Sequence, residues 1–520
     1  AILMALSIFM PVLAFAAVGF EDFKYNDRNR SVSSSVYFTE GEVDPEADGK
    51  VQVAVYSPDG DYIGVVDAIY NEDKSVNGAV YYDFVFDFRV GSAVYDSVYF
   101  AFGDVWTDVA NRPDKPRRGG GGGGIMPPPS QVDGDVIHVS GNQVSESALR
   151  QALQNHDHVT LKITGDYVLI PASVLADFTE AVITVEAQAG TYTLPLSVFN
   201  FDALVEELDA DLSNTNIRVG IAEVTGSMLQ EVNKAAKAVG AELVGNAVDF
   251  TLSAQAGNAS VDITNFGNVY VERTITVSSD VDPANATGAV LDAKAGEMKF
   301  VPSLFESEDG QTTVTLKRNT NSIYAVVTKD QSFADVPEDH WAAEDIDVLT
   351  SKLIVFGMTE SRFDLNRDIT RAEFAGLVVR SLGLDTNSTS STFSDVEAGK
   401  WYAKEVAAAA DAGIVYGYPD GTFRPNDLIT RQELASMVVR AMEYAGKDVS
   451  ISSAQANRIL NAFKDANEVG AWAKEELAFA IDAEIVHGMG NDRLSPRTNA
   501  TRAQATAMLY RYLQDVDFIN

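Results

Sequence analysis

The chain has 520 residues, of which 46% are hydrophobic and 22% charged, and a length of this size predicts about three or four domains. It contains no cysteine, which excludes disulfides, thiolate metal sites and a cysteine nucleophile. The formal net charge of -36 argues against a nucleic-acid partner, because phosphate binding needs clustered Lys and Arg.

The chain begins with a nearly unbroken apolar run. Residues 1–17 read AILMALSIFMPVLAFAA, and Ala14-Phe15-Ala16 fits the small-x-small pattern of a signal-peptidase site. A transmembrane helix is the alternative, but the run is shorter than the ~20 residues that a spanning helix needs, and Pro11 interrupts it. We therefore expect a signal peptide at residues 1–17 and a secreted chain with no membrane segment after its removal.

Residues 18–110 alternate apolar and polar side chains in short runs, such as residues 51–56, 78–88 and 93–102. This pattern, with turn residues such as those at 58–61, predicts an antiparallel β-sandwich of the Ig-like kind. Residues 111–130 follow with six glycines and three prolines, a composition typical of an interdomain linker.

Residues 131–330 mix strand and helix patterns. We expect strands at 159–163, 181–186, 217–224, 248–254 and 270–277, and helices at 145–154 and 227–238. Residues 288–301 and 312–328 look like hairpin strands that close a second lobe. The region is therefore predicted to be a strand-rich α+β ectodomain of two lobes.

The C-terminal region contains one unit copied three times. Each copy opens with Phe-x-Asp followed by Val or Ala, and a tryptophan follows at nearly the same offset. The aspartates are Asp335, Asp395 and Asp465, and the tryptophans are Trp341, Trp401 and Trp472. The spacing is 60 residues and then 70. It predicts three helical repeats, residues 331–390, 391–450 and 451–520, separable from the rest of the chain.

Each repeat continues with a helix, an Ile-Val-x-Gly segment, a loop and a second helix. In the second copy the glycine is Gly417, and Pro419-Asp420-Gly421 makes a tight turn. The second helix opens with Thr-Arg-x-Glu or Thr-Arg-x-Gln, a capping box in which Thr and Glu or Gln satisfy backbone N–H groups reciprocally. Capping does not explain the arginine, because a cation there faces the positive end of the helix dipole.

The arginines at this unfavourable position are Arg371, Arg431 and Arg502. A guanidinium beside free backbone N–H groups is suited to receive a carboxylate or phosphate. We expect these side chains to be exposed, so that replacing them with Ala would remove ligand binding and leave stability almost unchanged. Arg431 is the first candidate and Arg371 the second, whereas Gln504 replaces the capping Glu in the third copy.

These motifs resemble the S-layer homology (SLH) domain, and the second copy contains all of them. The resemblance implies an all-α triplet with three-fold pseudo-symmetry. Its inter-repeat grooves would bind a secondary cell-wall polysaccharide, often through a pyruvylated sugar, in Gram-positive-type bacteria. Carried over by position, the three arginines would hold the acidic group and the three tryptophans would shape the grooves. The motif aspartates and Gly417 belong to the same implied binding set. A buried core position is the alternative for each tryptophan.

Two functions are compatible with the sequence. The first is a cell-surface or S-layer structural protein whose residues 18–330 self-assemble, and the second is an anchored polysaccharide-active enzyme or an adhesin. We assign no catalytic residue and no enzyme activity, because no nucleophile elbow, phosphate loop or His-Glu-x-x-His helix is present. His156-Asp157-His158 supplies too few ligands for a metal and reads more simply as an exposed loop.

Acidic residues are concentrated in the first part of the chain. Residues 331–520 contain 18 Lys and Arg and 29 Asp and Glu, a net charge of -11, which leaves -25 for residues 1–330. Such a surface attracts hard cations, so Ca2+ is the one cofactor that we consider. No twelve-residue EF-hand loop is present, and a solvated acidic face is the simpler interpretation.

Overall fold

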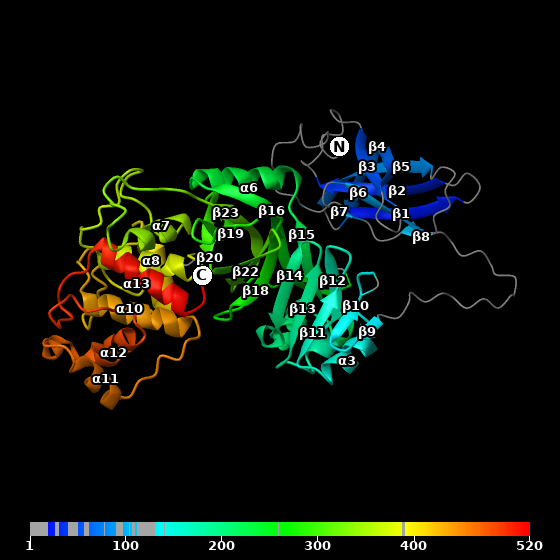
Figure 1. The fold of residues 1–520 in the computed structure, drawn as a ribbon. Helices are drawn as coiled ribbons and strands as arrows, with labels where there is room; N and C mark the ends of the chain where they lie inside the picture. The colour runs from blue at the N-terminus through cyan, green and yellow to red at the C-terminus, as the bar shows by residue number, and fades with distance from the viewer. Residues whose placement is uncertain are drawn as a thin grey trace. The chain divides into compact units, whose positions relative to one another are not determined.

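The computed structural model describes strand backbone within residues 19–111 and at 131–132, and residues 133–520 with side chains except 140, 258 and 387–390 (Figure 1). The chain divides into two compact units, Ala1–Gly124 and Ile125–Asn520. The predicted signal peptide, and the predicted linker after residue 111, lie outside the described residues.

The first unit is a single antiparallel sheet. Its strands are β1 (Gly19–Asn26), β2 (Ser31–Thr39), β3 (Lys50–Tyr56), β4 (Tyr62–Val76), β5 (Ala79–Arg89), β6 (Ser97–Phe102), β7 (Val105–Trp106) and β8 (Ala110–Asn111). Their order is β1-β2-β5-β4-β3-β6-β7, and β8 also pairs with β6. The strand-rich prediction is confirmed, but the two-sheet Ig-like sandwich is not. The long strand β4 pairs with β5 on one side and β3 on the other, so no break separates two sheets.

Two further sheets form the first part of the second unit. The first has the order β21-β22-β18-β14-β13-β11-β10-β9, and the second has β12-β15-β16-β23-β19-β20 with β17 paired to β16. The strands are β9 (Gln131–Asp133), β10 (Val136–His138), β11 (His158–Lys162), β12 (Tyr167–Pro171), β13 (Val182–Ala187), β14 (Gly190–Pro195), β15 (Asn216–Glu223), β16 (Glu242–Ala256), β17 (Ala259–Asp262), β18 (Val271–Val277), β19 (Ala286–Asp292), β20 (Glu297–Val301), β21 (Ser303–Glu308), β22 (Gln311–Arg318) and β23 (Ser322–Thr328).

One hydrophobic core joins the inner faces of these two sheets. Alternate residues of several strands enter it, as the burial pattern of β22 shows. The helices here are α3 (Glu146–Leu153), α4 (Ala172–Leu175), α5 (Phe201–Leu208) and α6 (Gly226–Ala238). Helix α6 packs on β16 and β20 and covers the other face of the second sheet (Figure 1). The strand-rich α+β prediction is therefore confirmed for this region.

The predicted pairing within residues 312–328 is wrong. Strands β22 and β23 lie in different sheets, and the chain crosses from one to the other at residues 319–321. The fully buried Arg273 holds this crossing, because its guanidinium donates hydrogen bonds to Thr320 O (2.9 Å) and Asn321 Oδ1 (2.8 Å). A side chain from another strand, which periodicity does not report, therefore fixes the connection.

The C-terminal part is helical, as the sequence predicts. Its helices are α7 (Ala343–Ser351), α8 (Arg371–Ser381), α9 (Ala403–Asp411), α10 (Arg431–Tyr444), α11 (Ser453–Leu460), α12 (Lys474–Asp482) and α13 (Arg502–Asp515). The second helix of each repeat packs against the first helix of the next, so α8 contacts α9, α10 contacts α12 and α13 contacts α7. The additional helix α11 accounts for the longer second spacing.

The repeats and the preceding sheets are joined through many contacts. Tyr270 Oη donates to Leu382 O (2.8 Å), and Lys352 Nζ donates to Pro283 O (2.8 Å). The C-terminal residue extends this interface: Phe305 N donates to Asn520 Oδ1 (2.9 Å), and the C-terminus lies beside β20 in Figure 1. Residues 125–520 thus form one compact unit, and the separability of residues 331–520 from the sheets stays a prediction.

Candidate functional site

Each repeat places its arginine at the first residue of its second helix, α8, α10 or α13. The capping box is present in all three copies, as predicted. In the first, Glu373 N donates to Thr370 Oγ1 (3.3 Å) and Thr370 N donates to Glu373 Oε2 (2.9 Å). These bonds fix where each helix starts and, with it, where the arginine lies.

The backbone N–H groups at these helix starts are occupied. Arg371 N donates to Asp427 O, Arg431 N to Thr498 O and Arg502 N to Arg367 O, at 2.9 to 3.0 Å. The next residue of each helix also donates to a carbonyl of the neighbouring repeat. The predicted anion receptor of free N–H groups is therefore absent at all three starts, because inter-repeat carbonyls fill it.

The arginine side chains are buried and not exposed, which corrects the prediction. Arg371, Arg431 and Arg502 are 6%, 3% and 9% exposed. Each Nε donates to a loop carbonyl of another repeat: Phe423 O (2.9 Å), Leu494 O (3.0 Å) and Phe363 O (2.9 Å), respectively. Repeat 1 thus contacts repeat 2, repeat 2 contacts repeat 3, and repeat 3 contacts repeat 1. Burial lowers the pKa of Arg431 to about 10, with the nearby Arg511 adding to the effect.

The motif aspartates hold the loops that these arginines contact. Both carboxylate oxygens of each aspartate accept a backbone N–H. Asp335 receives Phe363 and Asp364, Asp395 receives Phe423 and Arg424, and Asp465 receives Leu494 and Ser495, at 2.7 to 2.9 Å. Burial raises the pKa of Asp465, but the two N–H groups lower it further, so the net shift is downward. Each aspartate contributes by fixing its loop.

Gly417 lies where a larger residue does not fit. A Cβ at this position would lie 2.5 Å from Phe393 Cε1 and 2.8 Å from Thr422 O. The equivalent Gly357 in repeat 1 is as tightly enclosed, 2.5 Å from Phe333 Cε1. The Ile-Val-x-Gly glycine is therefore a close-packing requirement of the loop.

The three motif tryptophans are on the surface. Trp341, Trp401 and Trp472 are 59%, 60% and 56% exposed. The alternative of a buried core position is therefore wrong for each of them. Trp472 lies in a short 3-10 helix, Ala471–Ala473, that packs against α10, and Trp341 directly precedes α7, which packs against α13.

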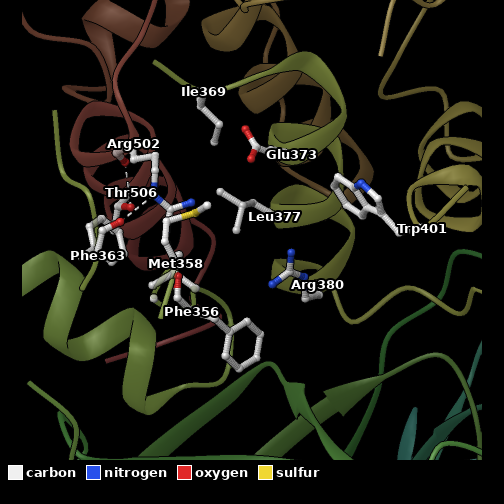
Figure 2. Close-up of a pocket in the computed structure, with 12 residues that line it drawn as sticks. Phe356, Met358, Phe363, Ile369, Glu373, Leu377, Arg380, Trp401, Arg502 and Thr506 are labelled. Carbon is white, nitrogen blue, oxygen red and sulfur yellow. Dashed lines mark hydrogen bonds between the residues drawn. The ribbon is translucent and has the colours of Figure 1, made fainter. Parts of the chain in front are cut away.

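A pocket lies between α8 and the tryptophan of repeat 2, Trp401. It contains about 610 Å³ of empty space, part of it open to solvent. Its apolar wall consists of Val355, Phe356, Met358, Phe363, Ile369, Leu377 and Trp401, and its polar groups are Glu373, Arg380, Arg502 and Thr506. Figure 2 shows Arg502 and Arg380 reaching this space from different helices, with Leu377 between them.

The pocket combines residues of all three repeats. The loop and α8 come from repeat 1, Trp401 from repeat 2 and Arg502 from repeat 3. We call this set site 1. The equivalent residues of the other repeats define site 2, with α10, Trp472 and Arg371, and site 3, with α13, Trp341 and Arg431.

A second row of arginines was missed by the sequence analysis. These are Arg380, Arg440 and Arg511, which donate from Nη1 to Ile354 O, Ile414 O and Ile485 O. They recur in every copy nine residues after the first arginine, so an aligned reading of the second helices would have found them. Burial lowers the pKa of Arg380 to about 10; Glu405 opposes this shift and Arg502 adds to it.

The His156-Asp157-His158 segment lies on the surface. His158 is exposed, and its Nε2 shares a hydrogen bond with Thr184 Oγ1 (2.8 Å). Within the described residues there is no cluster of three or more His, Asp or Glu able to hold a metal ion. No helix in the described part of the chain is long and apolar enough to cross a membrane.

The chain is similar in part to several known proteins. The chain is 34% identical to an amylopullulanase of Thermoanaerobacterium thermosulfurigenes over 272 residues, 52% of this chain and 14% of that protein. It is 30% identical to an S-layer protein of Bacillus thuringiensis subsp. finitimus over 198 residues, 38% of this chain and 23% of that protein. A cellulosome-anchoring protein of Acetivibrio thermocellus is 28% identical over 191 residues, 36% of this chain and 40% of that protein.

The chain therefore spans less than half the length of these relatives. The S-layer homology domain family matches residues 332–375, 392–435 and 462–506. These matches contain the repeated aspartates, tryptophans and arginines, and they confirm the resemblance inferred from the motifs. The C-terminal part of the chain, residues 332–506, consists of three S-layer homology domains.

Proposed function

We propose that this chain is a cell-surface protein held non-covalently on an anionic, pyruvylated secondary cell-wall polysaccharide, with binding at the sites between its three repeats. S-layer homology domains imply attachment to the cell surface. The observation that carries the proposal is the placement of an exposed tryptophan and buried arginines at each site. Tryptophan is enriched at binding interfaces because it offers a large apolar face together with an N–H donor.

The chemistry of site 1 fits an acidic sugar. Guanidinium groups form charge-assisted hydrogen bonds with a carboxylate. The face of Trp401, with Leu377 and Met358, offers an apolar wall for the carbon skeleton of the sugar. We propose that the motif arginines and tryptophans contact the ligand, whereas the aspartates and Gly417 shape the loops beside it.

We further propose that the three repeats are arranged with three-fold pseudo-symmetry. The closed series of Nε contacts from Arg371, Arg431 and Arg502 to successive repeats supports this arrangement. Short β-bridges also link the repeats in the same cyclic order, Thr370 with Leu428, Thr430 with Asn499 and Asp368 with Thr501. Each site would then present the same geometry to the polymer.

The outer part of the chain is proposed to act as a secreted S-layer or accessory surface component of a Gram-positive-type bacterium. Residues 18–330 would assemble with further copies, and Ca2+ bound by acidic faces would strengthen that assembly. The S-layer relatives support this proposal. Electron microscopy of the purified protein with and without Ca2+ would show an ordered array if it is correct.

An anchored polysaccharide-active enzyme is the second candidate. It is favoured by relatives that include an amylopullulanase, an exoglucanase and an endoglucanase. Release of soluble sugars from starch, xylan or cellulose by the purified chain would support it. Wall attachment through the repeats is common to both candidates.

The tryptophans provide the test of attachment. Replacing Trp341, Trp401 and Trp472 together with Ala should abolish co-sedimentation with wall sacculi, while the unfolding midpoint stays close to that of the wild type because the side chains are more than half exposed. Trp106→Ala, outside the repeats, is the control. Full co-sedimentation of the triple variant, or equal binding of the wild type to sacculi stripped of polysaccharide, would overturn the proposal.

A further inference from the structure

The two arginines of site 2 are both neutralised by carboxylates. Arg371 Nη1 lies 3.1 Å from Glu433 Oε1. Arg440 forms a two-pronged pair with Glu476, at 2.8 Å from Nε to Oε1 and 3.2 Å from Nη2 to Oε2. Tyr418 Oη also donates to Glu433 (2.9 Å). Site 2 therefore has no excess positive charge to offer a ligand.

The corresponding arginines of site 1 have no such partners. Among the described residues, neither Arg502 nor Arg380 forms an ion pair within 4 Å. Arg502 donates only to the carbonyls of Phe363 and Phe356, and Arg380 to those of Gly376 and Ile354. Both guanidinium groups are therefore hydrogen-bonded to carbonyl oxygens and face the pocket in Figure 2. Carboxylates act on them only through longer-range charge, Glu373 on Arg502 and Glu405 on Arg380.

One residue outside the motifs explains the difference. Glu373 is the counterpart of Glu433, but it pairs with Arg367, at 2.6 Å from Nη2 to Oε1. Repeat 2 has Asp427 at the position of Arg367. Because Arg367 takes the carboxylate of Glu373, Arg502 remains without a counter-ion, and one cation is in effect added to site 1.

The second arginine of site 1, Arg380, also has no carboxylate paired with it among the described residues. Glu405 is the counterpart of Glu476, but it does not reach Arg380, and its buried Oε2 has no hydrogen-bond partner among the described residues. A buried cation without an ion-pair partner is costly, and a carboxylate ligand would reduce that cost. Binding of an anion is therefore more favourable at site 1 than at site 2.

Site 1 also has more room beside its tryptophan. Gly376 lies on the face of α8 next to Trp401, where a Cβ would come within 3.8 Å of Cζ3. Repeats 2 and 3 have Ser436 and Ala507 at this position. The first copy is therefore the one in which no side chain of the helix occupies this position.

We infer that the acidic group of the wall polysaccharide binds at site 1, on Arg502 and Arg380, and that site 2 is closed to anions by its own ion pairs. This inference rests on the proposed function and assigns its ligand to particular side chains. Site 3 resembles site 1 in charge, because Gln504 replaces the glutamate and Arg431 and Arg511 form no ion pair among the described residues. It is the next site to be filled.

To test this inference, a glutamate is introduced beside Arg380 of site 1, so that this arginine is paired as Arg440 is in site 2. Phe356 is 41% exposed, and its ring centre lies 5.4 Å from the guanidinium carbon of Arg380. A glutamate there can pair with Arg380, so Phe356→Glu should weaken binding of the full chain to purified wall polysaccharide about tenfold or more. Phe356→Gln removes the same ring without adding charge and should bind several-fold more tightly than Phe356→Glu. Calorimetry measures both.

Repeat 2 offers the matched control. Tyr416 occupies the same motif position, is 63% exposed, and has its ring centre 4.4 Å from the guanidinium carbon of Arg440. Tyr416→Glu should change affinity by less than about twofold, because Arg440 is already paired. Conversely, Glu433→Gln should tighten binding by freeing Arg371, and the cap should persist because Gln504 performs it in repeat 3.

Two different failures can be told apart. If Tyr416→Glu weakens binding as much as Phe356→Glu, or if Phe356→Glu and Phe356→Gln bind equally, the assignment to site 1 is wrong while attachment through the repeats stands. If the wild type does not bind the polysaccharide at all, the proposed function is wrong. Should thermal unfolding show that Phe356→Glu does not fold, Met358→Glu at the rim of the same pocket, where the side chain is 48% exposed, carries the same expectation.

Discussion

Sites 1 and 2 have the same scaffold and opposite charge states. Both have an arginine at a helix start, a second arginine nine residues later, an exposed tryptophan and an aspartate-fixed loop. In site 2 both arginines are paired with carboxylates, whereas in site 1 neither forms an ion pair within the part of the chain that the structure describes. For Arg502 the difference comes from Arg367, which lies outside the repeated motif and pairs with Glu373. The motif therefore builds the site, and we propose that a residue outside the motif contributes to its affinity for an anion.

The largest effect expected from this comparison is on stability. Arg502→Ala leaves two loop carbonyls without donors and should cost about 2 to 4 kcal/mol of unfolding free energy. Arg371→Ala leaves one loop carbonyl without a donor and Glu433 without its ion pair. Because a hydrogen bond between charged groups is stronger than one to a carbonyl, this variant should cost at least as much as Arg502→Ala. Urea unfolding followed by tryptophan fluorescence measures both. Arg458→Ala, at an exposed position of α11, is the control and should be nearly neutral.

A clearly smaller loss for Arg371→Ala than for Arg502→Ala would contradict this comparison, because the ion pair with Glu433 would then contribute less than a hydrogen bond to one loop carbonyl. If each variant lost less than about 0.5 kcal/mol of unfolding free energy, the arginines would behave as exposed side chains, as the sequence predicts.

A smaller effect is expected from acid. Burial raises the pKa of Glu433, but hydrogen bonds from Thr430 and the charge of Arg371 lower it more, so its folded pKa lies below the usual 4.5. Its contribution to stability is therefore complete above pH 4.5 and is lost as the pH falls through the folded pKa. The same direction holds for Glu373, where Arg367 supplies the opposing charge.

Unfolding midpoints measured between about pH 6 and pH 3 should fall, and Glu433→Gln and Glu373→Gln should each reduce that fall. If only one of the two variants does so, the two carboxylates are not equivalently paired, and the account of how site 1 loses its counter-ion needs revision.

The sequence predicted the repeats, their capping boxes and most strands of residues 131–330, because these depend on local pattern. It placed Arg502 on the surface because its partners are not local: the Nε acceptor is the carbonyl of Phe363, 139 residues earlier. The same reason explains the error at residues 312–328, where Arg273 of another strand holds the crossing between sheets. The Ig-like prediction rested on the alternation of apolar and polar residues, and this pattern does not determine which strands pair.

Two features of the site could have been predicted from the sequence. The second arginine row and the substitution of Asp427 by Arg367 both appear once the copies are aligned in full. Whether Glu373 pairs with Arg367 or Arg502 depends on side-chain distances, however, and no alignment supplies these.

A structure of the full chain with a bound acidic fragment of the wall polysaccharide tests the central claim most directly. The account predicts that the acidic group accepts hydrogen bonds from Arg502 and Arg380, with Trp401 against the sugar and the ion pairs of Arg371 and Arg440 intact. An acidic group bound to Arg371, with Glu433 displaced and site 1 empty, would contradict it.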